Sequence, residues 1–168
     1  MSGFVIYRDL YYSTFTILGW QNLLEAEKNK KVVLDSFSFL STNNYVNIYA
    51  FVIMSNHLHV LWEILSPYRI DTIIHSFKSY TANQLSVLLD EEQRESFRVK
   101  KADRETQIWK KGSLSVEITT PKFLEQKMNY IHDNPRRAGL RKDNIDYKYC
   151  SYKSYYNGKV EFNFLTLL

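Results

Sequence analysis

The chain has almost no cysteine and no long apolar run. Cys150 is its only cysteine, which excludes an internal disulfide framework and a cysteine-rich zinc site. No segment approaches the roughly 18 consecutive apolar residues of a membrane-spanning helix, and the first residues lack the basic and apolar stretches of a secretory signal. Internal repeats and low-complexity segments are also absent. We therefore expect a cytoplasmic protein without a membrane anchor.

What is present is the composition of an ordinary globular domain with many aromatic residues. Hydrophobic residues make up 45% of the chain and charged residues 24%, whereas 13 tyrosines and 10 phenylalanines help to raise the aromatic share to 15%. A chain of 168 residues suits a single domain with one main core. We expect residues 1–146 to carry the main fold and residues 147–168 to form a basic, tyrosine-rich extension of the same domain.

The positive charge is concentrated near the end of the sequence. Residues 136–159 contain seven basic and two acidic side chains, so their excess is larger than the net charge of +4 for the whole chain. Basic groups interleaved with tyrosines can pair with phosphates and stack on bases, as single-stranded DNA requires. The candidate DNA contacts are Arg136, Arg137, Lys148, Tyr149, Tyr152 and Lys153. The alternative is a solvated tail that merely packs on the core.

Hydrophobic periodicity predicts the order strand, helix, hairpin, helix, strand, helix. The expected ranges are a strand over 11–19, a helix over 20–39, strands over 45–54 and 57–65, a helix over 70–89, a strand over 108–118 and a helix from Thr120 to about Asn134. Pro135 is expected to end the last helix, and residues 90–101 to form a solvated helix end or loop. This order predicts an α+β sandwich of ferredoxin-like type, with a mostly antiparallel sheet and helices packed on one face.

Two histidines interrupt the most apolar strand. His57 and His59 are separated by one residue, so both imidazoles lie on the same face of an extended strand. Neighbouring neutral imidazoles in an apolar setting are poorly solvated, and a divalent cation is the usual reason for such a pair. The alternative is a pair of hydrogen-bonded core histidines.

The last helix offers a matching pair of side chains. Tyr130 and Asn134 are four residues apart and share one helical face. If this face packs toward the histidines, Asn134 can add an oxygen ligand and Tyr130 stands beside the metal. A phenol is a weak nucleophile because its pKa is about 10, but a divalent ion that polarises a phosphodiester lowers the demand on it. The pattern favours transesterification on DNA, although Tyr130 could also simply pack.

These motifs resemble a known family. Residues 54–59 (MSNHLH) and 130–140 (YIHDNPRRAGL) resemble the HUH-type, single-tyrosine transposases of the IS200/IS605 group, with most likeness to the REP-associated tyrosine transposases. Residues 146–152 resemble the Tyr-x-x-Ser-Ser-Tyr segment of that branch, and the likeness spans residues 11–156. Ser55 stands where proline is common and Cys150 where the first serine is common, but neither change removes a catalytic group.

The resemblance implies roles for these residues. His57 and His59 would be a metal-ligand pair, Asn134 the third ligand and Tyr130 the nucleophile, with Mg²⁺ or Mn²⁺ as cofactor and residues 1–146 as the catalytic domain. The implied enzyme cleaves and rejoins single-stranded DNA beside hairpins through a 5′-phosphotyrosine. The alternative is a domesticated protein that binds DNA hairpins without cleaving them. A replication initiator or relaxase fits less well because the chain lacks a helicase region. Relatives include dimers, so a homodimer stays open.

Three other polar residues deserve comparison with this site. Glu63 has the same strand parity as the histidines, so it could orient a ligand, although a position at the edge of the core is an alternative. His132 lies off the Tyr130 face of its helix and is expected to be structural or to face DNA. His75 is expected to be an ordinary, partly exposed histidine.

Overall fold

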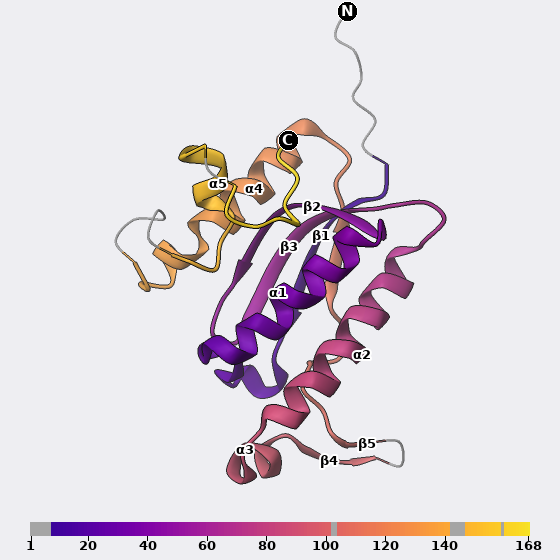
Figure 1. Cartoon of the computed structure of the whole chain (residues 1–168), viewed down its shortest axis with the longest axis vertical. Coiled ribbons are helices and arrows are strands. Elements are labelled where there is room, and N and C mark those ends of the chain that lie inside the picture. Colours follow the sequence, from indigo (N-terminus) through magenta and orange to yellow (C-terminus); the bar gives the residue numbers. More distant parts are fainter. Residues whose placement is uncertain (1–7, 102–103, 142–146, 159) are drawn as a thin grey trace, which may run out of the picture.

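The computed structural model describes residues 8–101, 104–141, 147–158 and 160–168 (Figure 1). Its centre is a four-stranded sheet in the order β2-β3-β1-β6, in which every neighbouring pair is antiparallel. The strands are β1 (Leu10–Thr16), β2 (Val46–Ile53), β3 (His57–Ile64) and β6 (Leu114–Glu117). The expected α+β class with an antiparallel sheet is confirmed.

Strand β3 lies in the interior of the sheet and pairs on both sides. Strands β2 and β3 form the expected hairpin, and β1 pairs with β3 from Leu10 opposite Glu63 to Thr16 opposite His57. Every residue of β3 except His57 and Glu63 is buried. Because successive side chains alternate between the faces of a strand, both faces of β3 must be covered.

Helices α1 (Glu27–Thr42) and α2 (Ile70–Leu88) cover one face (Figure 1). The core beneath them is aromatic: the rings of Phe37 and Phe77 stack with centroids 5.5 Å apart, and Phe15 lies 4.7 Å from Phe77. Trp62 of β3 is fully buried in the same cluster. Burying aromatic side chains of this size is the main source of stability on this face.

Helix α1 begins later than the sequence pattern suggested. Two 3₁₀ turns, Leu18–Trp20 and Leu23–Glu25, occupy the end of the expected strand over 11–19 and the first part of the expected helix over 20–39. Gly19 and Trp20 have φ angles of 65° and 57°, a left-handed conformation that cannot continue into a right-handed helix. The chain therefore turns here first and enters α1 at Glu27.

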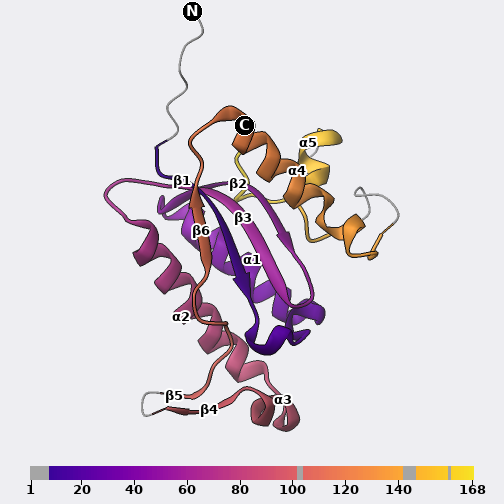
Figure 2. The same ribbon diagram turned by 180° about the vertical axis from the view of Figure 1, so that it is seen from behind.

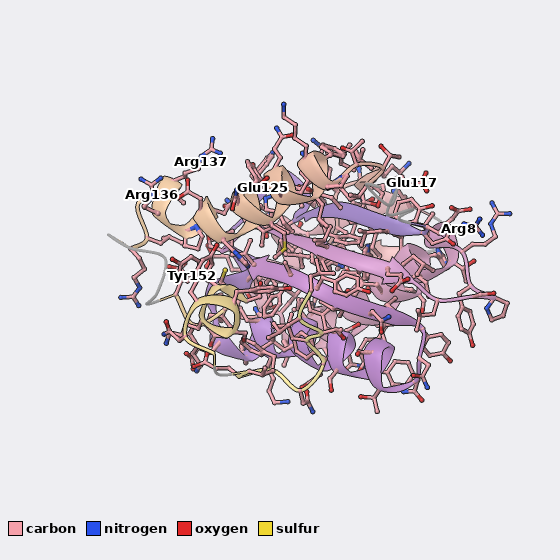
Figure 3. All side chains as sticks on the ribbon, turned by 90° about the horizontal axis from the view of Figure 1, so that it is seen from above. Arg8, Glu117, Glu125, Arg136, Arg137 and Tyr152 are labelled. Carbon is pink, nitrogen blue, oxygen red and sulfur yellow. The ribbon has the colours of Figure 1, made fainter. Side chains whose placement is uncertain are left out.

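Helix α4 (Pro121–Arg137) covers the opposite face, which corrects the expectation that all helices pack on one face. Figure 2 shows the sheet from behind, and Figure 3 shows α4 and α1 on opposite sides of the strands. Ala50, Val52 and Leu61 make this second face apolar, and Ile131 of α4 packs against the same cluster. A sheet with apolar residues on both faces needs a packed element on each face, and α4 is the element on the second face.

Helix α4 also passes through Pro135 instead of ending before it, contrary to expectation. Proline has no N–H to bond the carbonyl four residues before it, and its ring crowds that carbonyl, but only two residues of the helix follow Pro135, so only the last turn is affected. The end is closed by bonds from Gly139 N–H to the Arg136 carbonyl (2.9 Å) and from Leu140 N–H to the Pro135 carbonyl (3.0 Å). Gly139 has a φ of 70°, as this kind of helix end requires.

Residues between α2 and β6 form a short helix and a two-stranded sheet, and Phe97 anchors them in the main core. These elements are α3 (Glu91–Ser96), β4 (Arg98–Lys101) and β5 (Arg104–Thr106), where a helix end or loop was expected. Helix α3 forms because Asp90 and Gln93 make a reciprocal capping box. The expected strand over 108–118 is correspondingly shorter, since only its last part becomes β6 and Trp109 makes one isolated bridge with Ile17.

The C-terminal extension packs along β2. Cys150 and Leu165 make isolated bridges with Val52 and Ile48, and Phe164 is buried with Leu165 in the main core. The short helix α5 (Tyr152–Tyr156) lies beside α4 (Figure 1). No helix in the described part of the chain is long and apolar enough to cross a bilayer.

Candidate functional site

The candidate site lies between the start of β3 and the second half of α4. His57 and His59 share the α4 face, with ring centroids 4.9 Å apart. The ring of Tyr130 lies 5.2 Å from that of His59 at a steep angle. The structure therefore brings together the histidine pair and the tyrosine that sequence spacing had placed on two separate elements.

His59 is nearly fully buried, with 4% of its surface exposed. Its Nδ1 atom lies 2.8 Å from both the Tyr12 hydroxyl and the Thr14 hydroxyl. Its Nε2 atom is buried and has no hydrogen-bond partner among the described residues. Burial, with smaller contributions from His57 and Lys127, lowers the pKa of His59 to about 3. The imidazole is therefore neutral at physiological pH, which is the form that binds metals.

His57 is linked to two asparagine side chains. Its Nδ1 atom lies 2.7 Å from Asn56 Oδ1. Since an amide oxygen can only accept, Nδ1 is the donor of this bond. The neutral imidazole carries one proton, so Nε2 keeps its lone pair. Burial lowers the pKa of His57, and a hydrogen bond with the Asn134 side chain opposes that shift. Asn134 itself is only 8% exposed. The two imidazoles and this carboxamide thus lie in one buried cluster.

This donor set fits a divalent cation. Two imidazole nitrogens and one amide oxygen suit a borderline ion and leave positions for substrate oxygens. The unpartnered Nε2 of His59 is the atom that a metal would use, since a buried nitrogen without a partner is otherwise unfavourable. No group of three or more His, Cys, Asp or Glu residues that could hold a metal occurs in the described ranges, so any site here depends on Asn134.

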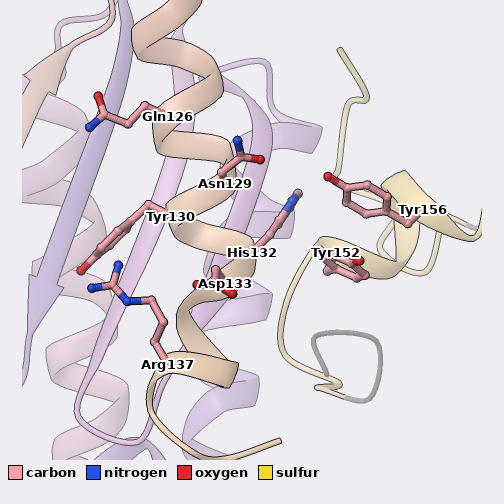
Figure 4. Close-up of a pocket in the computed structure, with 8 residues that line it drawn as sticks. All are labelled: Gln126, Asn129, Tyr130, His132, Asp133, Arg137, Tyr152 and Tyr156. Carbon is pink, nitrogen blue, oxygen red and sulfur yellow. The ribbon is translucent and has the colours of Figure 1, made fainter. Parts of the chain in front are cut away.

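Tyr130 lies among cations and aromatic rings. The Arg137 guanidinium is 5.2 Å from its ring centroid, and the Lys127 ammonium is 5.9 Å from it. Lys127 also lies 4.5 Å from the ring centroid of Tyr12, which meets Tyr130 edge-on. Figure 4 shows Tyr130 and Arg137 on the same side of α4, and His132 on the side toward α5.

Sequence reasoning missed Tyr12, Thr14 and Lys127. Thr14 stands directly opposite His59 in the β1–β3 register, but that register appears only once the strands are paired. Lys127 precedes Tyr130 by three residues, so helical spacing alone could have found it.

A groove of ≈ 560 Å³ lies over α4 and α5 beside Tyr130 (Figure 4). Tyr152 and Tyr156 stack on each other at its α5 side, with centroids 4.3 Å apart. The residues that line the groove are Gln126, Asn129, Tyr130, His132, Asp133, Arg137, Tyr152 and Tyr156. Aromatic faces, amides and a guanidinium together suit a nucleotide chain.

The candidate DNA contacts separate into groups. Arg137 and Tyr152 line the groove, whereas Arg136 forms an exposed ion pair with Asp133, its Nε 2.7 Å from Oδ1. Lys148 and Tyr149 lie elsewhere, at the start of α1. Lys148 pairs with Glu27 at 3.5 Å, and the Lys30 ammonium is 4.7 Å from the Tyr149 ring centroid. Lys153 belongs to α5 and is half-buried.

The remaining polar residues lie outside the cluster of His57, His59 and Asn134. Glu63, near the far end of β3, accepts hydrogen bonds from Asn47 and Tyr49. His132 bonds Ser151 Oγ at 2.9 Å and connects α4 to the C-terminal extension, and burial lowers its pKa to about 4. His75 borders a second groove of ≈ 1060 Å³ along α2.

Comparisons with known proteins bear on the family and on the fold. The family model described as "Transposase IS200 like" matches residues 15–134. A REP-associated tyrosine transposase bound to a REP hairpin is similar in structure, with a TM-score of 0.68 at 15% identity over 99% of this chain and 92% of that one.

A second solved structure, a transposase-like protein from Deinococcus radiodurans R1, has a TM-score of 0.52 at 14% identity and covers 78% of this chain and 94% of its own. At these identities both likenesses show the shared fold. No curated protein matches the chain significantly. The family match spans most of the chain and includes β3 and nearly all of α4. The chain therefore belongs to the IS200-like transposases, a family of DNA-processing enzymes.

Proposed function

We propose that the protein cleaves and rejoins single-stranded DNA beside hairpins, with Tyr130 as nucleophile and a Mg²⁺ or Mn²⁺ ion held by His57, His59 and Asn134. The observation that carries this proposal is the position of Tyr130, whose ring lies 5.2 Å from the ring of His59 on the helix that also supplies Asn134. A nucleophile and three potential ligands from two elements thus converge within one copy of the chain.

The bond changes balance without an external energy source. Tyr130 Oη bonds to phosphorus, the bond from phosphorus to the 3′-oxygen breaks, the phenol loses its proton, and the departing oxygen takes one up to become a free 3′-hydroxyl. A second 3′-hydroxyl reverses the step and rejoins the strands. The divalent ion would polarise the phosphodiester. The protein's own contribution is to hold the nucleophile at the ligand cluster.

Lys127 and Arg137 are suited to assist this step. Their charges lie 5.9 Å and 5.2 Å from the Tyr130 ring centroid. Cationic groups at these distances can attract the scissile phosphate toward the phenol. We therefore assign them to phosphate binding.

The groove over α4 and α5 is the proposed path of the strand near Tyr130. Arg137 can contact a phosphate, and the stacked pair Tyr152 and Tyr156 offers a platform for a base. A similar structure is of a transposase bound to a REP hairpin, and this supports a hairpin as the DNA partner here.

Covalent trapping tests the proposal. A labelled single-stranded hairpin with flanking sequence is incubated with the protein and Mn²⁺, and a denaturant-resistant adduct is sought. We expect the adduct with wild type and none with Tyr130→Phe, while hairpin affinity stays within a few-fold. Tyr80→Phe is the matched control, because it removes one hydroxyl from an exposed tyrosine of α2 outside the groove and should leave the adduct unchanged.

Two results would count against the proposal. An adduct that persists in Tyr130→Phe and maps to another tyrosine would move the nucleophile. Tight hairpin binding by wild type without any adduct would favour the alternative, a protein that binds hairpins but does not cleave them.

A further inference from the structure

Two hydroxyl groups of β1 lie close to Nδ1 of His59, whereas the other ring nitrogen, Nε2, has no partner among the described residues. Tyr12 Oη and Thr14 Oγ1 each lie 2.8 Å from Nδ1. The Tyr12 ring also stacks on the imidazole, with centroids 5.5 Å apart and an angle of 17° between the planes. Thr14 is directly opposite His59 in the strand register. The ring is thus held by a stack and by two polar contacts.

The contacts of the two ring nitrogens bear on which of them carries the proton of the neutral imidazole. Thr14 Oγ1 donates to Tyr12 Oη at 3.3 Å, so its own hydrogen is used and its lone pairs can accept a proton from Nδ1. In the opposite arrangement Nε2 would carry the proton, and this buried N–H would lack an acceptor among the described residues. An unsatisfied buried donor is costly. With the proton on Nδ1, Thr14 Oγ1 can accept it, and Nε2 keeps a free lone pair.

We propose that Tyr12 and Thr14 are positioning residues that hold His59 in its metal-ligating tautomer, with Nε2 free to bind a divalent cation. The inference rests on the proposed function, because it presumes the metal at His57, His59 and Asn134. A ligating histidine needs an acceptor for its other N–H, and loss of such a partner typically lowers metal affinity about 10- to 100-fold. Tyr12 and Thr14 fill this role with two oxygens from one strand.

Nearly isosteric substitutions test the pair. Tyr12→Phe keeps the stacked ring, and Thr14→Val keeps the branched shape, while each removes one oxygen. Titration calorimetry with Mn²⁺ should show about a 10-fold loss of affinity for each single variant and up to about 100-fold for the double variant. Thr14→Ser, which keeps the oxygen, should restore near-native affinity. The control is Ser13→Ala, because the Ser13 hydroxyl bonds the Trp62 indole on the other face of the sheet.

A second measurement reads the tautomer directly. Long-range ¹H–¹⁵N NMR spectra of the metal-free protein should show His59 protonated at Nδ1 in wild type and shifted toward Nε2 protonation in the double variant. His57 serves as the internal reference, since its Nδ1 donates to Asn56. A purely structural role for the hydroxyls would change the denaturation midpoint without changing this signature.

The outcomes separate the two proposals. If wild type binds no Mn²⁺, or if His59→Ala binds it as tightly, the metal centre and the positioning role both fail. If His59→Ala abolishes binding while the Tyr12→Phe, Thr14→Val double variant binds like wild type with an unchanged tautomer, the positioning role alone is overturned. Weaker binding in the double variant, with the tautomer shift and with rescue by Thr14→Ser, supports it.

Discussion

The two faces of the sheet are made by the same strands and are both apolar in part, but they differ in the polar groups that they bury. On the face covered by α1 and α2, β3 contributes Leu58, Val60 and Trp62 to a core of aliphatic and aromatic side chains. On the face covered by α4, the alternate positions include His57 and His59. One face therefore stabilises the fold, and the other buries polar groups that need specific partners.

The difference shows how the site can tolerate an unfavourable arrangement. Polar side chains under α4 and the C-terminal extension are mostly satisfied: Ser151 Oγ, for example, accepts from the Phe51 amide at 3.0 Å and contacts His132 at 2.9 Å. His59 Nε2 remains without a partner in the described part of the chain. A buried unpaired group costs about 1 to 3 kcal/mol, and the aromatic face can supply the stability that offsets this cost.

The largest expected effect comes from removing the proposed metal ligands under α4. His57→Ala, His59→Ala and Asn134→Ala should each reduce metal-dependent cleavage to near background, the histidines more than Asn134, because imidazole is the stronger ligand for Mn²⁺. Thermal stability should change little by comparison. Calorimetric titration with Mn²⁺ checks the assignment, and unchanged affinity in the double histidine variant would place any metal elsewhere.

A substitution on the face covered by α1 and α2 should lower stability and leave metal affinity unchanged. Phe77→Ala removes a fully buried ring that packs on Phe15 and Phe37, and we expect it to lower the free energy of unfolding by about 3 to 5 kcal/mol. Urea denaturation measures the loss. The Mn²⁺ affinity of the folded protein should stay unchanged, so a parallel loss of affinity would show that the two faces are coupled.

If the strand follows the groove over α4 and α5, substitutions of two tyrosines in the extension should differ in their effect on hairpin affinity, and this effect is smaller than those above. Tyr152→Ala should weaken hairpin binding by roughly 1 to 3 kcal/mol, the value of one stacked base, whereas Tyr149→Ala should have little effect because Tyr149 packs beside Lys30 at α1. Fluorescence anisotropy compares the variants. Point substitutions are needed because deletion of the extension would also remove Phe164 and Leu165 from the core. Equal losses of hairpin affinity for both variants would contradict the proposed path of the strand along the groove.

The smallest expected effect distinguishes two adjacent arginines. Arg137→Ala should reduce the slope of log K against log salt by about 0.7, the contribution of one phosphate contact on a single strand. Arg136→Ala should change it less, since Arg136 is paired with Asp133. Anisotropy across a salt series measures both slopes. A larger change for Arg136 would move the DNA path to the outer side of α4.

The sequence determined the local elements and the pairing of chemical groups within each. Period-2 and helical patterns located β2, β3, α2 and α4, because each pattern reports the environment of one segment. The same spacing put His57 and His59 on one strand face, and Tyr130 and Asn134 on one helix face. The late start of α1 and the passage of α4 through Pro135 escaped this reasoning, since both depend on single backbone conformations and not on periodicity.

Only the tertiary structure decided which faces meet. The sequence did not place α4 on the second side of the sheet, because that choice depends on which apolar surface remains uncovered after α1 and α2 have packed. Tyr12 and Thr14 reach His59 only through the antiparallel register of β1 and β3. Consecutive residues such as Arg136 and Arg137 look alike in sequence, but a helix turns about 100° per residue, and this rotation directs one toward Asp133 and the other over Tyr130.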